Sequence, residues 1–396
     1  MSKGKNVLFL TPRLPWPLIG GDRIKSYYLL KHLAKNHNVK LISFFYGNED
    51  YSEYVKELEK LNIKVVIHRI KTVPRILQML PKMFFRKPLE ILWFTDKNFQ
   101  KDVNDSIVND KIDIGFAFFM RTAEYLIGKN ISKVHIAEDC RTTYQYRSYK
   151  ASKSIPQRMI RWWEYNKLKN YEPTVIDKFD YTTLVSEEDI KYMQDSNPSA
   201  KLKLLTNGTD IDILKPDPNV KRKYLLLTGK LNIWANQLMI SKILKKFLPK
   251  LIEKYPDIVF KIVGAEPPDW VKELESKNIE IHSDVPSMMP FYQGAAVFLH
   301  PHYGATGIQN KLLEAMSSGC PVVTTITGNQ GIHGEHGKDL MLAKNDDEFL
   351  QYVMDLYDNP ELAKTVGDNA RKLIIETHSW QVINKQLDDI ISDVCP

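Results

Sequence analysis

The sequence predicts an α/β protein made of two doubly wound domains, each built on a parallel β-sheet. Short apolar runs alternate with amphipathic stretches along the whole chain, which is typical of parallel strands connected by helices. The series of strand-like runs starts afresh after about residue 220. The length of 396 residues also exceeds what a single hydrophobic core usually holds.

The first series of strands occupies the first half of the chain. The apolar runs that predict it are 6–10, 39–45, 64–68, 112–119, 133–137 and 181–185. The segment GDRIKSYYLLKHLAKN follows the first run, and its pattern predicts a helix whose apolar side starts with Ile24, Tyr27 and Tyr28.

The second series of strands follows a hinge-like segment. Residues 206–220 contain Asn-Gly and two prolines, which favour turns and linkers. The later runs are 223–229, 258–264, 279–282, 295–301, 321–325 and 339–343. We therefore predict a first domain over 1–208, a second over 209–376, and a C-terminal helix over 377–396 that crosses back to the first domain.

Composition and simple motifs exclude several classes of protein. The three cysteines are widely spaced, so neither a disulfide framework nor a CxxC metal site is expected. The N-terminal apolar run is too short for a signal peptide, and no run approaches the length of a membrane span. We therefore expect a cytoplasmic protein. A GxGxxG after the first strand and a P-loop are both missing, which argues against dinucleotide enzymes and P-loop NTPases.

A glycine pair follows the first predicted strand. In open α/β sheets ligands bind beyond the carboxyl ends of the strands, so a cleft between the two domains is the expected active site. Gly20 and Gly21 precede the first helix, where glycine lets the backbone approach an anion and free N–H groups point at it. An ordinary strand-to-helix turn is the alternative.

The segment HPHYGATGIQNKLLEAM resembles a second such loop. Thr306 and Gln309 have capping-box spacing, which predicts a helix that begins at Gly307. Lys311 and Glu314 then lie one turn apart. A lysine near a helix start is favourable if an anion such as a diphosphate lies between it and the helix terminus, and a carboxylate can accept hydrogen bonds from a ribose diol. A surface ion pair is the alternative.

Five motifs in order along the chain carry a resemblance to a known family. LIGGDRIKSYYLLKHLA, YTTLVSEED, TNGTDIDILKP, LEAMSSGCPVV and HSWQ together resemble the retaining GT-B glycosyltransferases of glycosyltransferase family 4. TPRLPWP, GIQNK and GNQGI are similar to the subgroup found with exopolysaccharide and glycoconjugate assembly. The resemblance implies a GT-B fold, with a nucleotide-sugar donor held mainly by the second domain and an acceptor held mainly by the first.

The resemblance also implies roles for individual residues. Glu314 matches the glutamate that binds the ribose hydroxyls, and Lys230 resembles the basic residue that meets the diphosphate. Gly20 and Gly21 match the loop that approaches the phosphates and the donor sugar. Val285 lies where backbone groups usually read the base.

Two further groups complete the expected site. Glu138, Asp139 and Arg141 follow a strand whose end usually meets donor sugar and acceptor, with Asp139 expected to act in catalysis. The loop residues that complete the donor-binding set are Gly304, Ala305, Thr306 and Gly307.

The chain departs from the family pattern at two positions. Thr306 stands where the family has a glutamate, and Ala235 stands where it has a second basic residue. We expect Lys311 to supply the missing charge and, with Lys230, to stabilise the departing diphosphate. A metal-independent reaction with retention at the anomeric carbon is expected, with no cofactor. His300 and His302 could bind a metal, but a third ligand is not evident.

Two basic segments stand out from the modest net charge of +7. Residues 61–89 contain seven Lys or Arg and no Asp or Glu, and residues 141–163 contain six and none. Both mix these cations with bulky apolar residues, which suits an anionic membrane surface or a diphosphate-lipid acceptor. Basic helices packed on a core are the alternative. Nucleic acid is not an expected partner, because the charge accompanies no nucleic-acid-binding module.

Two rival functions remain compatible with the sequence. A nucleotide-sugar 2-epimerase of the same fold would need acid and base groups but no acceptor, so product masses with and without acceptor would identify it. A non-catalytic nucleotide-sugar-binding subunit would fit the missing carboxylate at Thr306. Release of UDP without a partner protein would exclude that second alternative.

Overall fold

Seven parallel strands form the sheet of the first unit of the computed structural model, which describes residues 4–84, 86–152, 154–302 and 307–396. The strand order is β3-β2-β1-β4-β5-β6-β7. The strands are β1 (Asn6–Thr11), β2 (Asn38–Tyr46), β3 (Ile63–Ile70), β4 (Ile114–Phe118), β5 (Ser132–Glu138), β6 (Tyr181–Leu184) and β7 (Leu202–Leu204).

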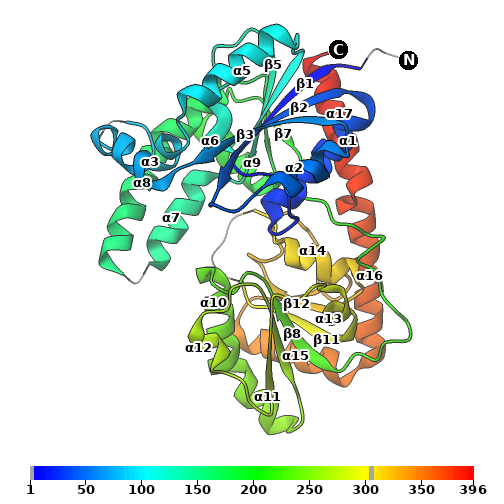
Figure 1. The fold of residues 1–396 in the computed structure, drawn as a ribbon. Helices are drawn as coiled ribbons and strands as arrows, with labels where there is room; N and C mark the ends of the chain where they lie inside the picture. The colour runs from blue at the N-terminus through cyan, green and yellow to red at the C-terminus, as the bar shows by residue number, and fades with distance from the viewer. Residues whose placement is uncertain (1–3, 85, 153, 303–306) are drawn as a thin grey trace. The chain divides into compact units, whose positions relative to one another are not determined.

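Helices lie on both faces of this sheet (Figure 1). They are α1 (Gly21–Asn36), α2 (Ser52–Glu59), α3 (Thr72–Met79), the 3-10 turn η1 (Leu80–Lys82), α4 (Leu89–Trp93), α5 (Lys97–Asn109), α6 (Met120–Ala123), α7 (Arg141–Ala151), α8 (Ile155–Ile176) and α9 (Glu187–Ser196). The core between helices and sheet is rich in aromatic rings, and Phe44 of β2 stacks on Phe99 of α5 with 4.3 Å between ring centroids.

The second unit contains a six-stranded parallel sheet of order β10-β9-β8-β11-β12-β13. Its strands are β8 (Tyr224–Thr228), β9 (Phe260–Gly264), β10 (Ile279–Ser283), β11 (Ala295–His300), β12 (Val322–Thr325) and β13 (Met341–Ala343). Its helices are α10 (Trp234–Lys242), the π-helical turn η2 (Ile243–Phe247), α11 (Leu248–Lys254), α12 (Asp269–Lys272), α13 (Met289–Gly294), α14 (Asn310–Ser317), α15 (Asp346–Asp358) and α16 (Pro360–His378).

The chain divides between the units at residues 206 and 383. The first unit comprises Met1–Thr206 and Asn384–Pro396, and the second comprises Asn207–Ile383. Helix α17 (Trp380–Val394) therefore contributes residues to both. The sequence placed these divisions at 208 and 376. Among the described residues, no helix is long and apolar enough to cross a bilayer.

The predicted strands are confirmed, and two details differ. The sequence missed β7, because Leu202–Leu204 is only three residues long and lacks a run of β-branched residues. The predicted start of α14 at Gly307 is wrong: the helix begins at Asn310, with Gln309 as the N-cap residue. Gly307 has φ 68°, a left-handed conformation that cannot be the first residue of a right-handed helix.

A close backbone approach at the carboxyl ends of β8 and β9 requires glycine. A Cβ atom at Gly264 would lie 1.7 Å from the carbonyl oxygen of Gly229. The two loops can therefore lie against each other only because residue 264 has no side chain.

Replacement of this glycine should be strongly destabilising. We expect Gly264→Ala to lower the free energy of unfolding by several kcal/mol, whereas Gly337→Ala should cost only about 1 kcal/mol for its positive φ. A Cβ at Gly337 (φ 75°) would meet nothing within 4 Å, which makes it a matched control in the same unit. Urea unfolding would measure both, and equal losses would contradict the close-approach argument.

Candidate functional site

The second sheet has a topological switch point between β8 and β11. Strand β8 is followed in the chain by β9 on one side of it, while β11 lies on its other side. In sheets of this type, the loops at the carboxyl ends of the strands diverge at the switch point, and ligands bind there. The loop at Gly229 and Lys230 follows β8, and the loop that leads to α14 follows β11.

Lys311 of α14 reaches the loop that follows β8. Its Nζ donates a hydrogen bond to Oδ1 of Asn236, and Nδ2 of Asn236 donates to the carbonyl oxygen of Lys230 at 2.7 Å. A Cβ at Gly229 would lie 3.2 Å from the same Nζ. The half-buried side chain of Lys311 therefore lies beside the backbone of Gly229. Its partner Asn236 directly follows Ala235, the position at which the family pattern has a basic residue.

Burial makes the charge of Lys311 costly. Desolvation lowers its pKa to about 8, and the negative charge of Glu314 opposes that shift. The ammonium thus lies in a place where an anionic ligand would stabilise its protonated form.

Glu314 is held by a different partner. Its Oε2 accepts a hydrogen bond of 2.7 Å from the hydroxyl of Tyr292, a fully buried side chain that also lies 3.0 Å from Oγ1 of Thr228. Burial raises the pKa of Glu314, while the hydrogen bond from Tyr292 and the charge of Lys311 lower it. Glu314 and Lys311 are both half-buried with separate partners, unlike a surface ion pair.

Two other predicted donor-site residues lie at neighbouring strand ends. Lys230 is 44% exposed and forms a 2.7 Å ion pair with Glu266, which follows β9. Val285 follows β10 and is half-buried, next to Asp284 with φ 50°. The predicted residues Gly304, Ala305 and Thr306 lie outside the described residues.

The two histidines at and just after the end of β11 are buried in the protein. His300 is fully buried, its Nδ1 lies 2.9 Å from Oγ1 of Thr324, and its ring stacks on that of His302 at 4.9 Å. Burial moves the pKa of His300 well below its usual value. Within the described residues, no group of three His, Cys, Asp or Glu side chains could hold a metal ion.

In the first unit, the predicted glycine loop leads to an ion pair that the sequence did not reveal. Helix α1 begins at Gly21, and Gly20 is its N-cap residue with φ 97°. Lys25, one turn later, is 2% exposed, and its Nζ lies 2.6 Å from Oε1 of Glu138. The same Nζ donates to the carbonyl oxygen of Leu205 at 2.6 Å.

This pair joins two of the predicted loops of the first unit. Glu138 ends β5 with φ 73°, an uncommon conformation for a residue with a side chain. Burial lowers the pKa of Lys25 and raises the pKa of Glu138, and the attraction between the two charges opposes both shifts. Sequence reasoning missed Lys25 because Ile24, Tyr27 and Tyr28 predicted a different buried side for α1; these three are only half-buried.

Asp139 and Arg141 lie just beyond Glu138. The guanidinium of Arg141 forms a 3.1 Å ion pair with Glu90 and lies 3.9 Å from Asp139. Glu172 accepts hydrogen bonds from the backbone N–H groups of Arg141 at 2.8 Å and of Thr142 at 2.9 Å, and so caps α7. The side chain of Arg141 is thus engaged within the protein, while Asp139 remains partly exposed.

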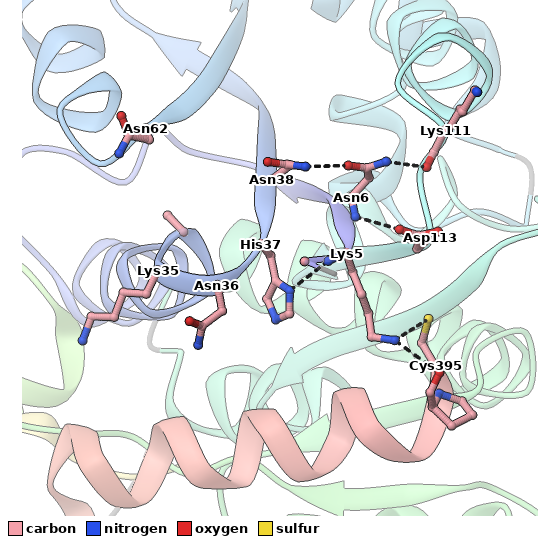
Figure 2. A pocket seen from close by; sticks show the side chains of 13 residues that line it. Lys5, Asn6, Lys35, Asn36, His37, Asn38, Asn62, Lys111, Asp113 and Cys395 are labelled. Atoms are coloured by element: carbon pink, nitrogen blue, oxygen red, sulfur yellow. Dashed lines mark hydrogen bonds between the residues drawn. The ribbon is translucent and has the colours of Figure 1, made fainter. Parts of the chain in front are cut away.

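A separate depression of about 870 Å³ lies at the amino ends of strands of the first sheet. Its lining residues, such as Asn6, Asn38 and Asp113, begin or precede strands (Figure 2). Lys5 there contacts Cys395 and Pro396 near the C-terminus. Parallel α/β sheets bind their ligands at the carboxyl ends of their strands, whereas this depression lies at the amino ends.

A family model matches the second unit. Residues 222–359 match the model described as glycosyl transferases group 1. The matched region runs from just before β8 to the end of α15, and it contains Lys230, Lys311 and Glu314. The second unit is therefore similar to glycosyl transferases group 1 over residues 222–359.

Curated relatives agree with this match. An uncharacterized glycosyltransferase of Methanocaldococcus jannaschii is 22% identical, and the alignment covers 98% of each chain. An uncharacterized 44.6 kDa protein in the cps region of Klebsiella pneumoniae is 27% identical, over 39% of this chain and 42% of its own. The capsular polysaccharide biosynthesis glycosyltransferase CapM of Staphylococcus aureus is 25% identical, over 38% and 44%.

Solved structures share the whole fold. Sucrose-phosphate synthase from Thermosynechococcus elongatus aligns over 98% of each chain with a TM-score of 0.71 and 14% identity. HepE from Anabaena, solved in complex with UDP-glucose, aligns over 98% of this chain and 100% of its own with a TM-score of 0.68 and 15% identity. The predicted GT-B fold of two parallel-sheet, Rossmann-like domains is confirmed.

Breaking the buried pair in the first unit should be costly and non-additive. Lys25→Met leaves the Glu138 carboxylate buried without a counter-charge, so we expect the free energy of unfolding to fall by about 3–5 kcal/mol. Glu138→Gln added to that variant should recover much of the loss, because the uncompensated charge is gone. A double-mutant cycle by chemical unfolding would measure this, and simple additivity of the two changes would count against a coupled pair.

Proposed function

We propose that this protein is a retaining, metal-independent glycosyltransferase of family 4. It would transfer a sugar from a nucleotide-diphosphate donor, most favourably a UDP-sugar, to a glycan or lipid-linked acceptor in polysaccharide or glycoconjugate synthesis. The arrangement of Lys311 and Glu314 on α14 carries the proposal. It places an ammonium and a carboxylate with separate partners at the switch point of a unit that is similar to glycosyl transferases group 1.

The donor's ribose and diphosphate would engage the two side chains differently. Glu314 accepts one hydrogen bond from Tyr292, and its remaining acceptor positions suit the two hydroxyls of a ribose. Lys311 lies beside the backbone of Gly229, so a diphosphate held there would meet both the ammonium and the loop. Lys230 in the same loop would add a second positive charge.

In the proposed reaction these cations stabilise the leaving group. Negative charge develops on the diphosphate as its bond to the anomeric carbon breaks, and donors fixed in advance lower the energy of that state. Asn236 positions Lys311 for this role through its hydrogen bond. In the first unit Asp139 would act in catalysis, and Glu138 and Arg141 would serve the donor sugar or the acceptor. Gly20 and Gly21 would approach the phosphates.

Two of the similar proteins support the choice of donor and pathway. HepE, whose fold this chain shares, was solved with UDP-glucose. CapM is named for capsular polysaccharide biosynthesis. We extend both to this protein, and we propose that it works in the cytoplasm, at the inner face of the cell membrane.

Loss of the Glu314 charge should weaken nucleotide binding. Glu314→Gln keeps an oxygen that accepts from Tyr292 but loses the charge that strengthens hydrogen bonds to a diol, so the Kd for UDP should rise roughly tenfold or more. Isothermal titration would measure this against Glu253→Gln, an exposed glutamate of α11. A screen of UDP, GDP and ADP would identify the base.

An unchanged affinity for UDP in Glu314→Gln would contradict the assigned ribose contact. Product analysis separates the rival functions. A 2-epimerase would convert the donor without acceptor, and a non-catalytic subunit would bind UDP-sugar but never release UDP on its own.

Loss of the Lys311 charge should slow the transfer step and remove a pH dependence. We expect Lys311→Met to lower kcat roughly tenfold or more. Because the pKa of Lys311 is about 8, its ammonium deprotonates as pH rises through that value. In the wild-type protein, affinity for UDP should therefore fall between about pH 7 and 9.5, and in Lys311→Met it should stay level.

Lys338→Met is the matched control, because Lys338 is an exposed lysine of the same unit. Full activity in Lys311→Met would defeat this mechanism, as would complete loss of wild-type activity in EDTA. NMR of the product would report retention or inversion at the anomeric carbon.

A further inference from the structure

Helix α3 exposes its apolar side. Val73, Ile76, Leu77 and Leu80 have the i, i+3, i+4, i+7 spacing of one helix face, and they are 67%, 44%, 63% and 50% exposed. An amphipathic helix of a globular protein ordinarily buries such a face against the core. In α3 and the η1 turn, this apolar face points to solvent.

The one cation of α3, Arg75, lies on its buried side. Arg75 is 5% exposed, and its guanidinium forms a 2.8 Å ion pair with Asp96 and donates to the carbonyl oxygen of Thr95. Asp96 is itself the N-cap of α5, where it accepts from two backbone N–H groups. This anchor fixes the rotation of α3, because turning the apolar face inward would break a nearly buried ion pair.

Helix α8 repeats the arrangement over its first two turns. Ile155, Met159 and Trp162 are spaced i, i+4, i+7 and are 74%, 66% and 53% exposed. The buried residues of α8 begin only at Glu164. Two helices of the first unit thus present apolar faces without protein cover.

Direct contacts join α8 to residues 83–87, which follow α3 and η1 in the chain. Lys167 of α8 donates to the carbonyl oxygens of Met83 and, at 3.1 Å, of Lys87. The ring of Phe84 lies 6.2 Å from that of Trp163. Phe84 is 84% exposed, the largest value among the large apolar side chains that the structure describes.

Exposed cations lie in the same segments of the chain as these apolar side chains. Not all cations of the two basic segments contribute, since Arg75, Lys87 and Arg141 pair with acidic residues. The remaining exposed ones include Lys71, Lys82, Arg86, Lys150 and Arg158. Neither 61–89 nor 141–163 contains an acidic residue that could neutralise them.

We propose that this surface docks on an anionic lipid bilayer. The α3–α8 surface consists of Val73, Ile76, Leu77, Leu80, Phe84, Ile155, Met159 and Trp162, with the cations Lys71, Lys82, Arg86, Lys150 and Arg158. Apolar side chains beside lysine and arginine fit the boundary between acyl chains and anionic headgroups. A second copy of this chain fits poorly, because two such surfaces would bring like charges together without a carboxylate between them. The proposal does not depend on the transfer reaction.

Vesicle flotation tests both components of the surface. In about 0.1 M NaCl, where charges remain partly unscreened, the wild-type protein should float with vesicles of phosphatidylcholine and phosphatidylglycerol in equal parts, and roughly tenfold less with phosphatidylcholine alone. The apolar variant Leu77→Ser, Phe84→Ser, Met159→Ser and the charge variant Lys71→Glu, Lys82→Glu, Arg86→Glu should each bind roughly tenfold less than wild type.

Two matched controls should bind as the wild-type protein does. Val108→Ser removes an apolar side chain that is 74% exposed on α5. Lys245→Glu, Lys246→Glu, Lys250→Glu reverses three exposed charges in the second unit and keeps the net charge equal to that of the charge variant. Because every substituted side chain is exposed, unchanged thermal unfolding of all variants is expected.

Several results would overturn the proposal. These are no flotation with the anionic vesicles, an equal loss in the second-unit charge control, or unchanged binding in the apolar variant. Light scattering that shows a dimer which Phe84→Ser converts to monomer would instead make the surface an interface between copies. Binding to a single-stranded oligonucleotide that the charge variant abolishes and vesicles do not compete for would make it a nucleic-acid interface.

Discussion

The parallel pairing of β8 and β11 is the constraint on which the second unit depends. Parallel strands need crossover connections. The connection after β8 leads to β9, and the connection after β11 leads to β12 in the other half of the sheet. The loop with Gly229 and the helix α14 therefore meet at the carboxyl ends of these strands, although they are far apart in sequence. Because Gly264 has no side chain, the backbone of Gly229 in the neighbouring loop can approach it closely.

Buried polar side chains then hold the charged residues at the switch point. Tyr292 of α13 and Asn236 of α10 each contact one charged residue of α14, so three helices combine to hold Glu314 and Lys311 in place. Half-buried charges are costly unless they have partners. Among the residues that the structure describes, each of these two charges has one side-chain hydrogen bond, which leaves it capacity for a ligand. The same physical reasoning applies to Lys25 and Glu138 in the first unit, where the two partners satisfy each other.

The surface properties of the first unit follow from similar anchors. Arg75 is drawn into the protein by Asp96, and the apolar residues of α3 are left outside. The sequence showed that basic and apolar residues are mixed in 61–89 and 141–163, but it could not separate the cations that pair internally from those that face solvent. Residues 63–70, which belong to the first basic segment, form β3 within the sheet.

The sequence by itself determined the strands, their order along the chain and the positions of Lys311 and Glu314 after the switch-point strand, because strand periodicity and helix spacing are local properties. It missed the three-residue β7 and placed the start of α14 at Gly307 instead of Asn310, because one backbone angle at Gly307 overrides the local cap pattern. The sequence could not identify three residues that contact the site, Tyr292, Asn236 and Lys25, because the partner of each lies in a distant segment of the chain. Only the tertiary structure decided which polar side chains are buried and paired, because burial and pairing depend on which segments the fold brings together.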